Sequence, residues 1–149
     1  IIYSKNYQGE VFMDKEEKVV HLQMIQDIIA RMGQNSFQIK GWAIGIMIAI
    51  FSFAGEQSNT RCILFTIIPL IIMWFLDSYY LQLERKFRLL YDDVRTSEKN
   101  KEYDMNFNNV KIKVKDSYKI SYFMILISIT EAVFYLTCIT TTTLIYLLG

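Results

Sequence analysis

Two carboxylates lie inside or beside long apolar runs, where their chemistry is constrained. Asp77 directly follows the apolar run at residues 62–76, and Glu131 is the single charge within residues 120–148. An ionisable side chain is costly at membrane depth and usually faces a charged partner or a watery cavity. We expect Asp77 to mark the membrane boundary and to pair with a nearby Arg or Lys. For Glu131 two interpretations stay open: it lies near the interface and reaches water, or it contributes to a pore or a polar contact between helices.

Small and hydroxylated side chains add two further candidate sites. Residues 140–143 are four consecutive threonines, whose hydroxyls can bond back to carbonyls of the preceding helical turn. We single out Thr140 and Thr141, together with Glu131, as candidates for lining a pore or for polar contacts between helices. Gly41 and Gly45 form a Gly-x-x-x-Gly spacing that lets two helix backbones approach closely. The simplest partner for these glycines is the second span of the same chain.

The sequence contains no recognisable arrangement of catalytic residues. His21 is the only histidine, and no Ser-His-Asp, Cys-His or metal-ligand spacing surrounds it. The six glycines are scattered and form no phosphate-binding loop. Cys62 and Cys138 lie in or beside apolar runs without a Cys-x-x-Cys spacing, as small apolar side chains do. We therefore expect a protein that is not an enzyme and that binds neither a cofactor nor a metal.

Long apolar segments must position these residues. Hydrophobic residues make up 52% of the chain, beside one Pro and six Gly, which favours helices in lipid. The apolar runs at 42–54 and 62–76 are joined by a short polar turn and predict an antiparallel transmembrane hairpin. Residues 120–148 exceed one bilayer crossing, so we place 119–128 at the interface and 129–148 across the membrane. The alternative of a soluble buried hairpin is disfavoured, because 149 residues cannot easily bury three such runs.

The predicted fold is an all-α membrane protein. It has a transmembrane helical hairpin with cytosolic helical extensions and a third transmembrane segment at its C-terminus. Residues 1–12 are a leader or linker that can be non-native, 13–40 a cytosolic amphipathic helix and 41–80 the hairpin. Residues 81–118 form a cytosolic helix and basic loop, and 119–149 the interfacial segment and third span. Residues 110–115 alternate apolar and basic side chains, as in a short strand or a segment lying on headgroups.

Charge distribution predicts the orientation. The 16 basic and 15 acidic residues leave a net charge of +1, so we expect no direct binding of nucleic acid. Five basic residues precede Trp42, ten lie between 78 and 119, and only Arg61 lies in the hairpin turn. By the positive-inside rule, the N-terminus and the central segment are cytosolic. Lys40 and Trp42 are expected to act as a snorkelling cation and an interfacial anchor.

The second span is predicted to continue as a charged helix through residue 95. Glu84 and Arg88 are four residues apart in the order that favours an ion pair on a helix. We take this helix, with the amphipathic helix before the first span, as the candidate receiver for a cytosolic partner or signal. Its candidate residues are Asp77, Tyr80, Glu84, Arg85, Arg88 and Tyr91.

Three ordered strings resemble a family of small, uncharacterised bacterial multi-span membrane proteins. They are NSFQIKGW at 35–42, FLDSYYL at 75–81 and ERKFRLLYDDVR at 84–95. The layout of spans and cytosolic helix is also similar to the SLATT-type membrane effectors of antiphage defence loci. That resemblance implies a cytosolic partner that detects infection and a membrane protein that oligomerises and perturbs the bilayer. It also implies a multi-pass protein of the bacterial inner membrane.

Two functions remain in competition. The first is a self-associating membrane effector or pore component in antiviral defence, in which Glu131 and the threonines line an ion path. The second is a non-enzymatic anchor or regulatory subunit that holds a soluble partner at the membrane. Both predict a bilayer, further copies of the chain and a cytosolic protein or signal as partners, but only the first predicts leakage.

Overall fold

The structure is a computed structural model that describes residues 15–57, 61–96, 105–106 and 120–148. The possible leader at 1–12 and the alternating segment at 110–115 lie outside the described residues, as does most of the polar loop before that segment. Within the described ranges the chain is helical and contains no strand. The helices are α1 (Lys15–Gln57), α2 (Arg61–Leu64), α3 (Ile67–Thr96), α5 (Tyr122–Leu126) and α6 (Ile129–Leu148).

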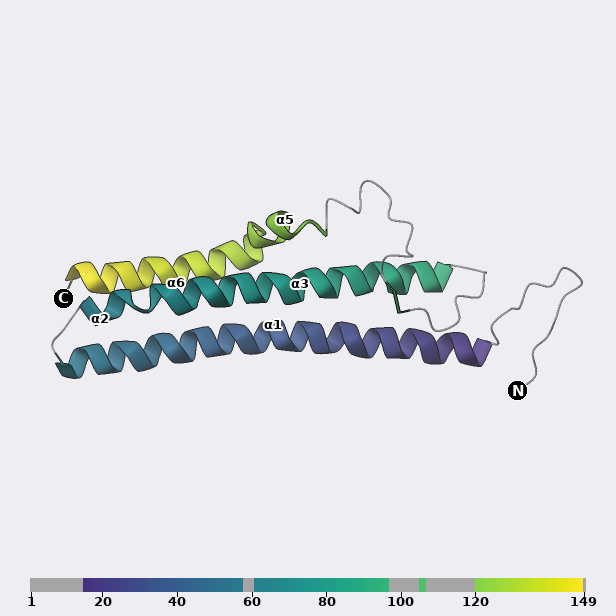
Figure 1. Cartoon of the computed structure of the whole chain (residues 1–149), viewed down its shortest axis with the longest axis horizontal. Helices are drawn as coiled ribbons and strands as arrows, with labels where there is room; N and C mark the ends of the chain where they lie inside the picture. Colours follow the sequence, from purple (N-terminus) through teal and green to yellow (C-terminus); the bar gives the residue numbers. More distant parts are fainter. Residues whose placement is uncertain (1–14, 58–60, 97–104, 107–119, 149) are drawn as a thin grey trace, which may run out of the picture.

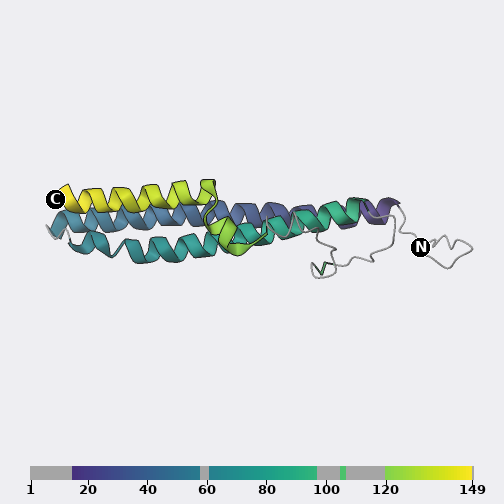
Figure 2. The same ribbon diagram turned by 90° about the horizontal axis from the view of Figure 1, so that it is seen from above.

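The helices form an elongated bundle with two parts. α1 and α3 lie side by side over their length, and α6 runs along only the part of this hairpin near the turn (Figures 1 and 2). Three helical stretches, 16–55, 61–96 and 129–148, are long and apolar enough to cross a membrane. The predicted fold class, an all-α membrane protein with a hairpin and a third C-terminal segment, is confirmed. We call residues 15–35 of α1 and 78–96 of α3, which reach beyond α6, the hairpin extension.

α1 is one unbroken helix rather than an amphipathic helix followed by a separate span. Its 43 residues correspond to about 65 Å at 1.5 Å per residue. In the hairpin extension, Ile25 packs against Leu90 and Val94, and all three side chains are buried. These residues recur at helical spacing on facing stripes of α1 and α3, so burial of apolar surface holds the extension together.

A second core lies where α6 joins the hairpin. Ala43 of α1, Leu70 of α3 and two α6 residues, Tyr135 and Cys138, are buried there. The small Ala43 side chain allows the other two helices to approach α1 closely. The rings of Tyr135 and Trp74 stack with centroids 5.8 Å apart. This core fixes the rotation of α6 about its own axis, because Tyr135 and Cys138 must face inward.

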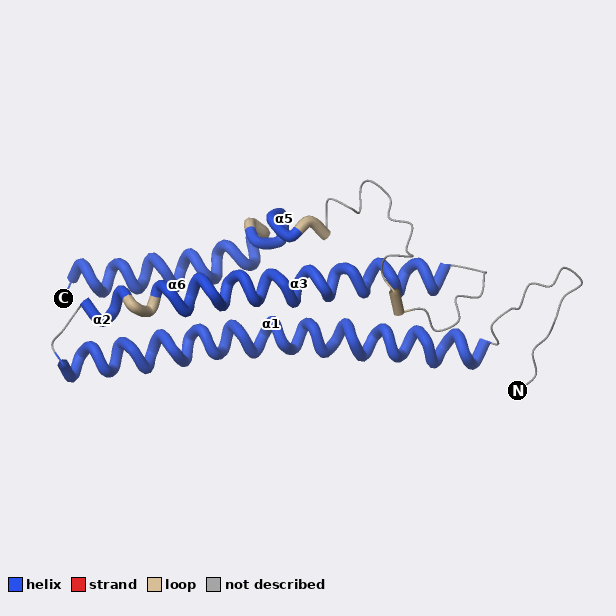
Figure 3. Tube along the Cα trace, in the orientation of Figure 1, coloured by secondary structure: helices blue, strands red, loops and turns tan. Residues whose placement is uncertain are grey.

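Pro69 explains a break that separates α2 from α3. Phe65 and Thr66 form a turn between the two helices, visible as a short loop in Figure 3. Pro69 has no backbone N–H and its ring clashes with the carbonyl four residues earlier, which is that of Phe65. The chain closes the end of α2 with tighter bonds, from Phe65 N to Cys62 O (3.1 Å) and from Thr66 N to Ile63 O (3.0 Å). The second span therefore starts with a kink.

Three hydrogen bonds, each donated by a side chain to a backbone carbonyl, hold α5 and the residues before it against α3. Trp74 Nε1 donates to Leu126 O (3.2 Å), and Gln82 Nε2 donates to Ile120 O (2.9 Å). The Tyr122 hydroxyl donates to Phe75 O (3.0 Å), and burial raises the pKa of this phenol above its ordinary value. These three bonds place α5 beside residues 74–82 of α3, at the start of the hairpin extension.

Candidate functional site

Five polar side chains meet where α1, α3 and α6 come together, and we call them the polar cluster: Ser36, Lys40, Asp77, Glu131 and Tyr135. Lys40 Nζ lies 2.5 Å from Asp77 Oδ2 and 2.9 Å from Glu131 Oε1. The Ser36 hydroxyl donates to Asp77 Oδ1 (2.5 Å), and the Tyr135 hydroxyl donates to Asp77 Oδ2 (3.1 Å). One ammonium group thus joins carboxylates from two other helices.

Helical spacing explains why these residues converge. Ser36 and Lys40 are four residues apart on α1, and Glu131 and Tyr135 are four apart on α6. Residues at this spacing share one face of a helix. On both helices that face is continued by the buried core described above. Asp77 occupies the corresponding inward face of α3 and is fully buried.

The polar cluster holds two acids for one lysine and has one acceptor without a partner in the described part of the chain. Its two carboxylates share a single ammonium group, and their side chains are 0% and 3% exposed, against 23% for Lys40. Glu131 Oε2 is buried and has no hydrogen-bond partner among the described residues. Asp77 accepts bonds from three side chains, whereas Glu131 accepts one from Lys40. Asp77 is therefore the central acceptor, and Glu131 is the more weakly held carboxylate.

Helix lengths give the distance of the polar cluster from the ends of the spans at the hairpin turn. Lys40 precedes the end of α1 by 17 residues, Asp77 follows the start of α2 by 16, and Glu131 precedes the end of α6 by 17. At 1.5 Å per residue, each lies about 24–26 Å from the far end of its span. A hydrocarbon core is about 30 Å thick, so spans that begin at its far edge would hold the polar cluster about one helical turn within it.

Both carboxylates singled out in the sequence therefore belong to one site. Asp77 pairs with a lysine, as expected, but it is fully buried between helices, whereas the other candidate receiver residues are exposed or partly exposed. The interpretation in which Glu131 reaches water does not describe this structure, because the residue is 2% exposed and bonds to Lys40. The structure shows a polar contact between helices at Glu131.

Sequence reasoning missed three members of the polar cluster. Lys40 was expected to snorkel outward, yet its side chain turns into the bundle and meets two acids. Ser36 and Tyr135 were not predicted as site residues. Their signal was present in the spacing, since Ser36 lies one turn before Lys40 and Tyr135 lies one turn after Glu131.

The candidate pore threonines lie on a different face of α6 from Glu131. Thr140 and Thr141 are exposed, whereas Thr142 is buried beside the core. Thr140 donates to Thr137 O (3.0 Å), and Thr142 donates to Cys138 O (2.8 Å). Glu131 and the two exposed threonines therefore form no continuous polar strip within one chain.

Gly41 and Gly45 do not mediate packing inside the chain. Both are exposed, and a Cβ built at either position would meet no atom within 4 Å in the described structure. The expected partner, the second span, lies on the opposite side of α1, against Ala43. The two glycines leave a flat surface on the outside of the bundle.

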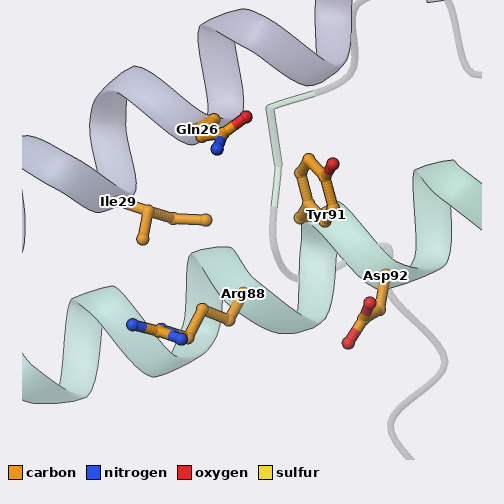
Figure 4. Close-up of a pocket in the computed structure, with 5 residues that line it drawn as sticks. All are labelled: Gln26, Ile29, Arg88, Tyr91 and Asp92. Atoms are coloured by element: carbon orange, nitrogen blue, oxygen red, sulfur yellow. The ribbon is translucent and has the colours of Figure 1, made fainter.

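The other candidate receiver residues lie on the hairpin extension. A cavity of about 390 Å³ lies between α1 and α3, lined by Gln26, Ile29, Arg88, Tyr91 and Asp92. Figure 4 shows Gln26 and Ile29 across from Arg88 and Tyr91. Arg88 donates to Glu84 Oε1 from Nε (2.9 Å) and Nη2 (2.6 Å), which is the predicted ion pair. Tyr80 does not line this cavity; with Trp42 it lines a separate groove nearer the spans.

Within the described ranges no group of three or more His, Cys, Asp or Glu side chains could hold a metal ion. Fold and polar cluster together define a three-span helical membrane protein with a charged link between its spans. None of the protein-family models, curated proteins and solved structures compared with the chain matches it.

Proposed function

We propose that this protein is an oligomeric membrane effector that perturbs the bilayer in response to a cytosolic signal, in bacterial antiviral defence. In this proposal the hairpin extension lies in the cytosol of a bacterial cell and receives a partner protein or a signal. The spans of several copies then assemble in the inner membrane.

The observation that carries this proposal is the link from the hairpin extension to all three spans. α1 and α3 run without interruption from the extension into the membrane part. At the edge of the membrane part, Lys40 joins α1 to α3 through Asp77 and to α6 through Glu131. A force applied to the extension therefore acts on every span through covalent helix or a buried ion pair.

Self-association is supported by the uncovered faces of the spans. Only 11%, 28% and 22% of the apolar windows in the three spans are buried within the chain. In lipid such faces bind other helices where small residues permit close approach. Gly41 and Gly45 provide such a place on α1.

A pore would then lie between copies rather than within one. Its polar lining would come from outward residues such as Thr140 and Thr141, because Glu131 is occupied inside the bundle. An alternative function, a non-enzymatic anchor for a soluble partner, is favoured by the polar cavity on the hairpin extension. The anchor binds its partner without conducting ions.

Leakage tests the effector proposal. Purified protein in liposomes is expected to release a trapped dye and to run as an oligomer in detergent. The double variant Thr140→Val/Thr141→Val should leak several-fold less, because two outward hydroxyls are lost. Thr142→Val is the matched control, since this threonine faces the core, and it should leak like the wild type.

Two outcomes contradict the pore. A monomer in sealed vesicles removes self-association, and a stable oligomer in sealed vesicles that binds a soluble partner supports the anchor instead. Equal leakage by both threonine variants and the wild type would show that the path avoids this face of α6.

A further inference from the structure

A small cavity lies between α3 and the residue that precedes α5. Its volume is about 220 Å³, and it is lined by Arg85, Arg88, Leu89 and Ile120. Pockets for drug-sized ligands measure roughly 300–1,000 Å³, so this one fits a fragment the size of a phosphate ester. Two arginine and two apolar side chains line it, which suits a ligand with a charged and an apolar end.

The local charge favours an anion. Both charged residues that line the cavity, Arg85 and Arg88, are basic. Glu84 engages Arg88 through Nε and one terminal nitrogen, while 64% of the Arg88 side chain stays exposed. A guanidinium has five N–H donors, so Arg88 can hold Glu84 and a phosphate oxygen together. Arginine is well suited to phosphate because its planar fork matches two oxygens at once.

The depth of the cavity matches the phosphates of one leaflet. Arg61, in the hairpin turn, marks the opposite edge of the bilayer, and Arg85 lies 24 residues further along. At 1.5 Å per residue this is about 36 Å. The hydrocarbon core accounts for about 30 Å, and the headgroup layer extends a further 5–8 Å or so. Arg85 therefore lies at the level of the headgroups.

α5 supplies an apolar surface on the side of the cavity that faces the spans, beside residues 74–82 of α3. Phe123 on this short helix and Ile127 directly after it are 71% and 69% exposed, although the segment is tied to α3 through Trp74. Exposed aromatic and aliphatic side chains beside a basic surface are typical of segments that lie in the bilayer interface. Ile120 connects the cavity to this apolar surface, which gives the glycerol and acyl part of a lipid a place to lie.

We propose that this cavity binds the headgroup phosphate of one anionic phospholipid, from the leaflet on the side of the hairpin extension. Arg85 and Arg88 hold the phosphate, and Leu89 and Ile120 contact the adjoining carbon atoms. The site rests on the membrane-spanning fold and does not depend on the effector function.

Native mass spectrometry of the full-length protein in detergent tests the site. The wild type is expected to retain one dioleoylphosphatidylglycerol per chain and to bind it more tightly than dioleoylphosphatidylcholine. Each basic contact with an anionic headgroup is worth a factor of about five, so Arg85→Gln/Arg88→Gln should weaken binding about 30-fold. Arg95→Gln is the matched control with unchanged binding, because Arg95 lies ten residues beyond Arg85 and lines no part of the cavity.

A variant that is expected to bind the lipid more tightly separates an effect on binding from a defect in folding. Glu84→Gln removes the acid that competes for Arg88, so it should tighten phosphatidylglycerol binding several-fold. The proposal is overturned if Glu84→Gln weakens binding, if Arg95→Gln weakens it as much as the double variant, or if both lipids bind equally. Displacement of the lipid by glycerol 3-phosphate at equal concentration would assign the site to a soluble phosphate and overturn the proposal that it binds a lipid.

Discussion

Asp77 and Glu131 share one lysine, but they differ in the number of hydrogen bonds that they accept. Asp77 is completely buried and accepts bonds from Ser36, Lys40 and Tyr135. Glu131 accepts one bond and keeps a second buried oxygen unpaired among the described residues. When a buried acceptor is removed, its donors are left unsatisfied, which lowers the free energy of unfolding by about 1–3 kcal/mol. Removing a surplus buried charge, by contrast, relieves repulsion between the two acids.

Neutralising the two acids should therefore have unequal effects. Asp77→Asn replaces an acceptor oxygen by a donor facing other donors and should lower the free energy of unfolding by about 2–3 kcal/mol. Glu131→Gln leaves one acid for one lysine and should change it by less than about 1 kcal/mol. Unfolding in mixed detergent micelles, followed by circular dichroism, measures both. Equal losses would show that the two acids contribute alike.

Among the helices, the outer face of α1 is a place where a substitution should affect the proposed assembly of copies but not the stability of a single chain. Gly41 and Gly45 have open space where a side chain would lie. Substitution by isoleucine there costs little inside one chain, yet it fills the surface on which a second helix would pack.

We expect Gly41→Ile/Gly45→Ile to leave the unfolding transition of the chain almost unchanged and to reduce the oligomer to smaller species. Sedimentation in detergent measures the mass. Gly55→Ile serves as the control, because Gly55 is also open but lies at the far end of the helix. Full-size oligomers of the double variant would place the contact between copies on another helix.

The elements show how far periodicity and composition reach. The apolar runs predicted both arms of the hairpin, and α6 covers the same residues, 129–148, that were assigned to the third span. The turn at Phe65 and Thr66 was not predicted, although Pro69 is its cause. The unbroken course of α1 was likewise not fixed by pattern, because Gly33 and Gly41 weaken a helix without ending it.

The polar cluster was predictable only in part, for a physical reason. Spacing within a helix shows that Ser36 shares a face with Lys40, but it does not show which face of another helix lies opposite. The rotation of α6 depends on the stacking of Tyr135 on Trp74, across 61 residues of sequence. Asp77 and Glu131 were thus found as separate candidates, and Lys40 between them was not.

At the scale of the whole molecule, the two ends of the bundle should lie on opposite sides of the membrane. In a background without Cys62 and Cys138, a membrane-impermeant maleimide should label Arg61→Cys in intact cells. Arg95→Cys should be labelled only after permeabilisation, because basic residues flanking spans stay in the cytosol. The reverse pattern would invert the proposed orientation and place the hairpin extension outside.

In the proposed effector, the hairpin extension would act as a lever about the polar cluster, because α1 runs through it without a break. About 38 Å of helix lie on the N-terminal side of Lys40 and about 26 Å on the other side. A sideways displacement of the N-terminal end of α1 therefore moves its C-terminal end in the opposite direction, by about two-thirds of that displacement. In the proposed oligomer, a partner that shifts the N-terminal end of α1 by a few ångströms would thereby change the gap between neighbouring copies at the far ends of the spans.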